Sequence, residues 1–273
     1  MLRHLARHAH SRLGCVHHRR LSVGVAASWG APVTWHSARV LTNTREAQGL
    51  QLLRVQVPPA VAAGYTAPGQ YLQMRTQETD KPAFIAIASP VGAHTGGVVE
   101  LLVKEVPGTT AAALCALPAG SGVDVSDMQG SGFQLASKLP ADKFPNVYVF
   151  ATGSGLSPIR SLMDSPEHLG GLSGSAKRHV KLYVGVRSPD HLPFGERIKA
   201  WEAAGVHVRR VFSKTASGEH AQYVQEAFRA DGGVKTNADT TGAVVIGQKP
   251  AFEELCAAFA EAGVPKDRML TNF

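Results

Sequence analysis

The chain has 273 residues, of which 44% are apolar, and its formal net charge is +7. This length allows one large hydrophobic core or two modest ones, and it favours two domains. No run of about 18 apolar residues occurs, so the sequence predicts no membrane-spanning helix. The first 28 residues hold five arginines and no acidic residue. Most of the basic charge therefore lies in this leader, and it does not predict a nucleic-acid partner.

The first predicted segment is residues 1–28, MLRHLARHAHSRLGCVHHRRLSVGVAAS. Leu2, Leu5 and Leu13 could share one helical face opposite the arginines, as in organelle transit peptides. A secretory signal is disfavoured because the segment has no uninterrupted apolar core. The ending Val-Ala-Ala-Ser favours the chloroplast, with the mitochondrion as the alternative. A leader that is merely an unstructured tail is the other interpretation.

Residues 29–143 are predicted to form an antiparallel β-barrel or a sandwich. Short apolar runs such as VTWHSARVL, LQLLRVQV and VVELLVK alternate with turn residues that include Pro-Pro, Pro-Gly and Gly-Gly pairs. One helix is predicted over residues 109–117, TTAAALCAL, because alanine favours helices and Pro118 helps to end the segment. The domain boundary is expected within KLPADKFP, residues 138–145.

Residues 144–273 are predicted to form an α/β domain with a doubly wound parallel sheet. The strand-like runs NVYVFAT, HVKLYVGV, VHVRRVF and AVVIG alternate with segments of helical pattern at 158–165, 192–204, 220–230 and 250–262. This alternation is typical of a parallel sheet that is covered by helices on its faces.

The first strand of this domain ends in a glycine-rich turn, ATGSGLSP, residues 151–158. Gly153 and Gly155 let the backbone turn sharply and approach a ligand closely. Ser157 is predicted as the N-cap of the next helix, and Pro158 suits its first position. Backbone N–H groups and the helix dipole would then face an anion such as a pyrophosphate. The alternative is a tight turn that binds no ligand. These residues alone do not decide between the two interpretations, and Pro158 replaces the third glycine of the motif GxGxxG.

The segment ATGSGLSPIRSL resembles the nicotinamide-dinucleotide motif GTGxAP of the ferredoxin-NADP reductase family. Further resemblances follow in the same order as in that family: PGQYLQMR at 68–75, LYVGVRSPDHLPF at 182–194, VFSK at 211–214, GEHAQYVQEAF at 218–228, and the ending VPKDRMLTNF. The resemblance covers about residues 33–273. It implies an FAD-binding barrel followed by an NAD(P)-binding domain. It also implies hydride transfer between NAD(P)H and FAD, with electrons passed to a ferredoxin, a quinone or a small oxidant.

The resemblance also implies the candidate site residues. The dinucleotide candidates are Thr152, Gly153, Ser154, Gly155, Leu156, Ser157, Pro158 and Gly247. The flavin candidates on the barrel are Ile87, Ala88 and Ser89, followed by Gly108, Thr109 and Thr110 at the start of the predicted helix, where backbone N–H groups and two hydroxyls could hold a pyrophosphate. Arg187 is either a phosphate partner or a solvated loop arginine. Phe273, the catalytic candidate, would lie over the flavin face, with a phenylalanine that anchors the core as the alternative.

The sequence departs from the family mainly at flavin contacts. The family motif Arg-x-Tyr-Ser falls on residues 83–86, where Ala83, Ile85 and Ala86 replace the arginine, the tyrosine and the serine. Lys81 is either a displaced phosphate anchor or a solvated lysine. Ile246 replaces the cysteine that lies near the nicotinamide in many relatives. Flavin binding is therefore a weaker expectation than dinucleotide binding, and a binding or assembly protein without efficient flavin chemistry is the alternative function.

The coenzyme expectation depends on Ser213, Lys214 and Tyr223, which match in order the residues that surround the 2′-phosphate in relatives that prefer NADPH. Lysine attracts phosphate as a point charge, so the expected preference for NADPH over NADH is moderate. A lysine that only keeps the loop soluble is the alternative. Outside the leader, Cys115 and Cys256 show no metal-binding spacing and are expected to be small buried side chains.

Overall fold

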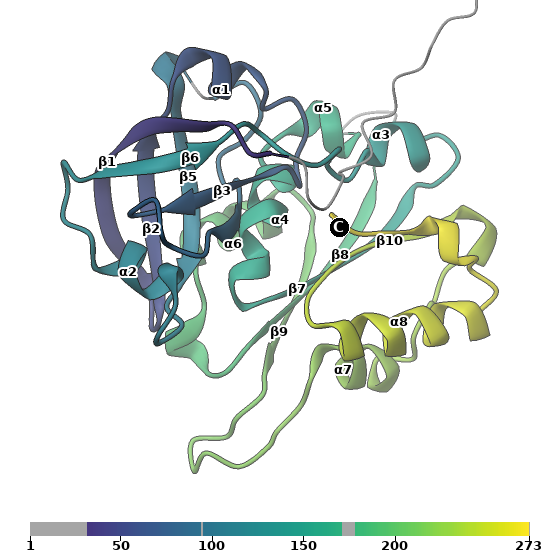
Figure 1. The fold of residues 1–273 in the computed structure, drawn as a ribbon. Coiled ribbons are helices and arrows are strands. Elements are labelled where there is room, and N and C mark those ends of the chain that lie inside the picture. Colours follow the sequence, from purple (N-terminus) through teal and green to yellow (C-terminus); the bar gives the residue numbers. More distant parts are fainter. Residues whose placement is uncertain (1–31, 94, 171–177, 273) are drawn as a thin grey trace, which may run out of the picture.

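The computed structural model describes residues 32–93, 95–170 and 178–272. Within these residues the predicted fold class is confirmed: an antiparallel six-stranded sheet precedes a parallel five-stranded sheet with helices (Figure 1). The predicted transit peptide, residues 1–28, and the catalytic candidate Phe273 lie outside the described residues. None of the described helices is long and apolar enough to cross a membrane.

The first sheet closes into a barrel. Its strands are β1 (Trp35–Ala47), β2 (Leu50–Gln56), β3 (Tyr71–Arg75), β4 (Ala83–Ala86), β5 (Val98–Lys104) and β6 (Gly122–Ser126), in the order β4-β3-β6-β1-β2-β5. All paired neighbours are antiparallel. An antiparallel bridge between Ile87 and Leu101 joins the extension of β4 to β5, which closes the sheet. The helix predicted over 109–117 is confirmed as α2 (Thr110–Ala116), and α1 (Pro59–Ala63) is a short helix that the sequence did not reveal.

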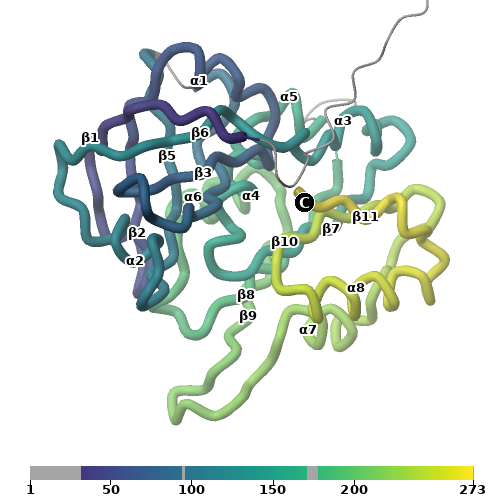
Figure 2. Tube along the Cα trace, viewed as in Figure 1, coloured from purple at the N-terminus to yellow at the C-terminus, as the bar shows by residue number. Residues whose placement is uncertain are grey.

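The second sheet is parallel throughout. Its strands are β7 (Asn146–Thr152), β8 (His179–Val186), β9 (His207–Phe212), β10 (Thr241–Ile246) and β11 (Met269–Leu270), in the order β11-β10-β7-β8-β9. Figure 2 shows β11 beside β10 near the C-terminal end. Every residue of β10 is buried, as are the five residues of β7 from Val147 to Ala151. Both strands are covered on two faces, which explains their continuous apolar sequences.

Helices cover both faces of this sheet. The main helices are α4 (Leu156–Met163), α6 (Gly195–Ala203), α7 (Val224–Ala230) and α8 (Lys249–Glu261), and the short ones are α3 (Leu135–Lys138) and α5 (Pro166–Leu169). Side chains of α4 and α6 share one buried cluster with the sheet, and those of α7 and α8 share another. In the second cluster the Phe228 and Phe259 rings stack with centroids 5.0 Å apart. The boundary that we predict after residue 143 falls between α3 and β7.

Helix α4 fastens the α/β domain to the barrel. Arg160, only 6% exposed, places its Nη2 2.5 Å from Oε2 of Glu100 on β5. One turn earlier, the Ser157 hydroxyl donates to the Ala86 carbonyl on β4 at 2.8 Å. The Tyr65 hydroxyl donates to the Ser89 carbonyl at 2.8 Å and contacts the Ser161 hydroxyl. Burial raises the pKa of Tyr65, so its phenol stays protonated and acts as a donor.

Glu100 allows a matched test of this interface, because two arginines pair with it. Arg160→Leu removes the buried partner and is expected to lower the free energy of unfolding by about 2 kcal/mol. Arg54 approaches the same carboxylate only to 3.7 Å, and 49% of its side chain is exposed. Arg54→Leu should therefore cost no more than about 0.5 kcal/mol. Urea denaturation measures both values, and equal losses would contradict the role given to Arg160.

Candidate functional site

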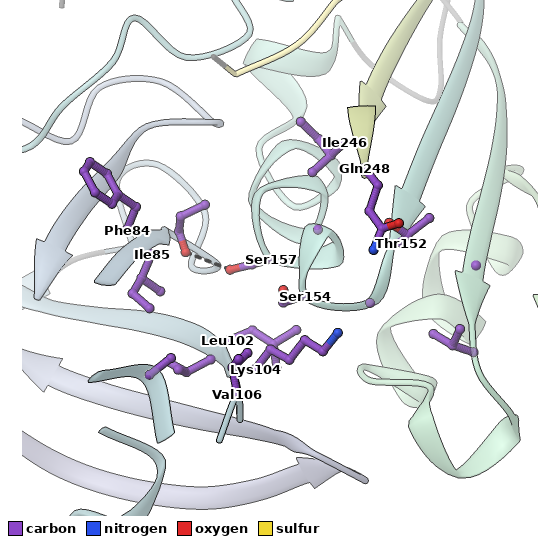
Figure 3. A pocket seen from close by; sticks show the side chains of 18 of the residues that line it. Phe84, Ile85, Leu102, Lys104, Val106, Thr152, Ser154, Ser157, Ile246 and Gln248 are labelled. Atoms are coloured by element: carbon purple, nitrogen blue, oxygen red, sulfur yellow. Dashed lines mark hydrogen bonds between the residues drawn. The ribbon is translucent and has the colours of Figure 1, made fainter. Parts of the chain in front are cut away.

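A cleft of about 1520 Å³ lies between the two sheets and is lined by both (Figure 3). The barrel contributes β4, the end of β5 and the start of α2. The α/β domain contributes the carboxyl ends of β7, β8, β9 and β10 and the starts of α4, α7 and α8. The carboxyl edge of a parallel sheet is where ligands bind in doubly wound folds. The fold therefore puts its expected ligand edge against the barrel.

Most of the candidate site residues from the sequence analysis line the cleft. Its lining includes Gly108, Thr109, Thr110, Thr152, Gly153, Ser154, Gly155, Ser157, Pro158, Arg187, Ser213, Tyr223 and Gly247. The remaining described candidates lie elsewhere. Leu156, Ile87, Ala88 and Ser89 are buried in the core, and Lys214 is joined by a backbone bridge to His220 outside the cleft lining.

The glycine-rich turn is a 3₁₀ turn, Gly153–Gly155, that runs directly into α4. Gly153 has φ +53°, a left-handed conformation, and a Cβ there would meet no atom within 4 Å. This position therefore has open space beside a backbone that favours glycine. The prediction that Ser157 caps the helix is wrong. Helix α4 begins at Leu156, and the Ser157 hydroxyl instead bonds to the barrel, so Pro158 is the third helical residue.

Gly155 is a glycine for a different reason. Its φ is −60°, which any residue adopts, but a Cβ would lie 2.7 Å from Ile246 Cγ2 and 3.1 Å from the Ile246 carbonyl oxygen. Ile246, the residue in place of the family's cysteine, thus packs against the backbone of the turn (Figure 3). Close packing, rather than approach to a ligand, accounts for this second glycine.

The barrel wall of the cleft is mostly apolar, with Ile85, Leu102 and Val106 on it (Figure 3). The two threonine hydroxyls expected to hold a pyrophosphate are already committed as donors. Thr109 Oγ1 donates to the Val106 carbonyl and Thr110 Oγ1 to the Lys81 carbonyl, each at 2.7 Å. An anion on this side would therefore depend on backbone N–H groups and on lysines.

Four charged residues of the cleft were missed from the sequence: Asp80, Lys104, Glu226 and Glu254. In Figure 3 Lys104 points from the end of β5 toward the turn at Ser154, and β5 contacts that turn. No ion pair joins Lys104 to an acid in the described part of the chain. Lys104 is the last residue of a strand, which is a common place for a solvated lysine. Its position in the sequence therefore does not indicate that it lines a cleft. Glu226 could have been found, because it stands three residues after Tyr223, the spacing of a helix-capping glutamate.

Among the groups with a shifted pKa, Asp80 lines the cleft, whereas Cys115 and Cys256 are absent from its lining. A hydrogen bond from the Thr76 hydroxyl lowers the pKa of Asp80, so this carboxylate stays ionised. Burial raises the pKa of the Cys115 thiol to about 11 and also raises that of Cys256, so neither is a ready nucleophile. Both cysteines are half-buried. The described residues contain no group of three or more side chains able to hold a metal ion.

Comparison with known proteins gives a sequence relative and solved structures of similar fold. The chain is 32% identical over 245 residues to the fruit protein pKIWI502 of Actinidia deliciosa, covering 86% of this chain and 75% of that protein. No family model matches the chain. Among solved structures, the Amycolatopsis cytochrome P450 reductase GcoB has a TM-score of 0.71 at 21% identity, over 88% of this chain and 70% of that one. A ferredoxin-NADP⁺ reductase from Neisseria gonorrhoeae with bound FAD and NADP has a TM-score of 0.69 at 16% identity, over 88% and 99%.

The packing role of Gly155 can be measured without any ligand. Gly155→Ala is expected to lower the free energy of unfolding by about 2 kcal/mol, because the new Cβ overlaps Ile246. Gly195, the first residue of α6, is the control: a Cβ added there would meet no atom within 4 Å, and its φ is not left-handed. Gly195→Ala should therefore be neutral or stabilise the protein by up to about 1 kcal/mol. Thermal or urea unfolding compares the two, and a neutral Gly155→Ala would remove the packing explanation.

Proposed function

Because the chain belongs to the family of the fruit protein pKIWI502 and has the ferredoxin-NADP reductase-like fold of FAD/NAD(P)-binding oxidoreductases, we propose that it is an NAD(P)H-dependent flavin oxidoreductase. The observation that carries this proposal is the turn Gly153–Gly155. It lies at the carboxyl end of β7 and faces the same cleft as the barrel wall. A dinucleotide at the turn and a flavin on the barrel would therefore share one space.

The described residues fit a dinucleotide at the turn. The open space beside Gly153 lets a ligand approach the backbone, and the Ser154 side chain lines the cleft next to it. Helix α4 begins immediately afterwards, with the Leu156 N–H donating to carbonyls of the turn, and the helix dipole favours a pyrophosphate at the turn. Lys104 adds a cation from the barrel side, and Arg187 adds one from the end of β8.

The barrel wall fits the ring system of a flavin, because Ile85, Leu102 and Val106 offer an apolar surface. Lys81 and the start of α2 would face its phosphates, without the arginine found in relatives. When both are bound, the nicotinamide and the flavin supply the redox chemistry, a hydride transfer between their rings. The protein's own part is to hold the two rings in one cleft and to exclude water from between them.

The electron acceptor is a separate molecule in this proposal, since the described residues offer no metal or cluster site. A ferredoxin, a quinone and a small oxidant are the candidate acceptors. Residues 1–28, rich in arginine and free of acids, support targeting to the chloroplast, with the mitochondrion as the alternative.

One observation favours a second candidate function, a dinucleotide-binding protein that does not retain a flavin. Ala83, Ile85 and Ala86 replace the arginine, tyrosine and serine of the family motif, so Phe84 is the aromatic residue that β4 contributes to the cleft. Both nearby threonine hydroxyls donate to backbone carbonyls. Such a protein would act as a binding or assembly partner, and the fraction of it that holds a coenzyme would vary with the concentration of that coenzyme.

The phosphate role of the turn can be tested at Ser154 with two side chains of equal size. Ser154→Asp puts a carboxylate where the proposed pyrophosphate would lie, so the affinity for both NADH and NADPH should fall at least about tenfold. Ser154→Asn adds the same volume without charge and should change either affinity by no more than about threefold. Calorimetric titration of the coenzymes measures this, and equal effects of Asp and Asn would exclude a phosphate at the turn.

The flavin expectation is tested on the purified full chain. If the protein is a flavoenzyme, it should be yellow as isolated, or become so with added FAD, with flavin absorbance equimolar to the chain. The bound flavin should lose its colour on addition of NADH or NADPH without oxygen, because the two rings share the cleft. A colourless protein that does not bind added FAD but does bind a coenzyme would support the second function.

A further inference from the structure

The cleft has two different ends, and a dinucleotide bound in it must have a fixed direction. Given the proposed function, its nicotinamide faces the barrel wall, where the flavin would lie. The other end is lined by Ser213 after β9 and by Gln222, Tyr223 and Glu226 around the start of α7. Figure 1 shows α2 on the barrel and α7 beside α8 in the α/β domain. The adenosine end of the coenzyme would therefore lie beside the start of α7.

Glu226 is held in a fixed position at this end. Its Oε2 accepts the backbone N–H of Tyr223 at 2.6 Å, which caps the first turn of α7. The same oxygen lies 3.3 Å from Nε2 of His220. The other oxygen, Oε1, has no hydrogen-bond partner among the described residues. The cap thus positions a carboxylate at the cleft wall and leaves one oxygen to accept from a ligand.

Glu226 also differs from the other acid at this end, because no arginine or lysine among the described residues forms an ion pair with it. Glu254 lines the cleft as well, but Arg229 lies 3.1 Å from its carboxylate. The partner of Glu226 is an imidazole, which is not a permanent cation. Lys214, expected from the sequence to attract a 2′-phosphate, is absent from the lining of the cleft.

From this placement we infer that Glu226 makes the protein select NADH over NADPH. A carboxylate accepts hydrogen bonds from the ribose hydroxyls of NADH, whereas it repels the 2′-phosphate of NADPH. The inference rests on the proposed function for the presence of a dinucleotide, and it replaces the NADPH preference expected from Lys214. Arg187 is the cation that lines the same side, and it remains available to the pyrophosphate that both coenzymes share.

The test measures dissociation constants of NADH and NADPH by calorimetry on the full chain and two variants. Glu226→Gln removes the charge but keeps the cap, since glutamine also accepts an N–H at this helix position. Glu219→Gln removes the same charge from the neighbouring loop, outside the lining of the cleft. We expect the wild type to bind NADH about tenfold more tightly than NADPH, and Glu226→Gln to reduce that ratio at least about fivefold, mainly by tightening NADPH. Glu219→Gln should leave the ratio unchanged.

The possible outcomes distinguish a failure of this inference from a failure of the proposed function on which it depends. Tight coenzyme binding with an unchanged ratio in Glu226→Gln overturns the selectivity role alone. An equal change in both variants has the same meaning, because it would reflect net charge rather than position. If neither coenzyme binds the wild-type protein, the proposed function fails and the inference fails with it. Equal thermal stability of the three proteins confirms that the cap survives the substitution.

Discussion

The contact between Arg160 and Glu100 is the constraint on which the site depends. An arginine with 6% of its surface exposed needs a partner, because an unpaired buried charge is strongly unfavourable. Its partner lies on β5 of the barrel, and its helix begins at the turn that faces the cleft. Asp164, at the end of the same helix, lies 3.7 Å from Arg160 Nε and shares this charge, so the bond to Glu100 helps to hold the turn near the barrel wall. The Ser157–Ala86 bond and the Tyr65 hydroxyl add neutral hydrogen bonds along the same helix.

Close packing at the carboxyl edge of the parallel sheet shapes the floor of the cleft. A Cβ at Gly185 would lie 2.6 Å from Val224 Cγ1, and one at Gly247 would lie 3.1 Å from Thr152 Oγ1. Gly155 is limited by Ile246 in the same way. These glycines let neighbouring elements approach one another, and the space left over is the cleft. Gly153 differs, because its φ is positive and its surroundings are open. Gly108, on the barrel side of the cleft, resembles Gly153: its φ is +74° and a Cβ added there would meet no atom within 4 Å.

The sequence predicted the fold well because its signals are local. Continuous apolar strands followed by helical segments predict a parallel sheet, and short runs between Pro and Gly turns predict an antiparallel one. The sequence did not predict the roles of residues whose environment depends on contacts with distant parts of the chain. Ser157 has the composition of an N-cap, yet its hydroxyl finds the Ala86 carbonyl, a residue 71 positions away. Lys104 and Lys214 are both ordinary lysines in sequence, and only the fold puts the first in the cleft and the second outside it. Ile87, Ala88 and Ser89 follow the flavin motif in sequence but turn into the core.

The two walls of the cleft offer an anion physically different partners. On the α/β side the N–H groups of the turn are held in place by the helix that follows, so they need no reordering when a phosphate arrives. On the barrel side the hydroxyls of Thr109 and Thr110 already donate to carbonyls, which leaves the backbone N–H groups at the start of α2 and the charge of Lys81. Lysine is a flexible point charge, and exposed charges are screened by salt. Preorganised donors favour the dinucleotide, whereas mobile charges must lose side-chain entropy to hold a flavin phosphate. We therefore expect the dinucleotide to be held more firmly than the flavin, the reverse of an enzyme built around a resident flavin.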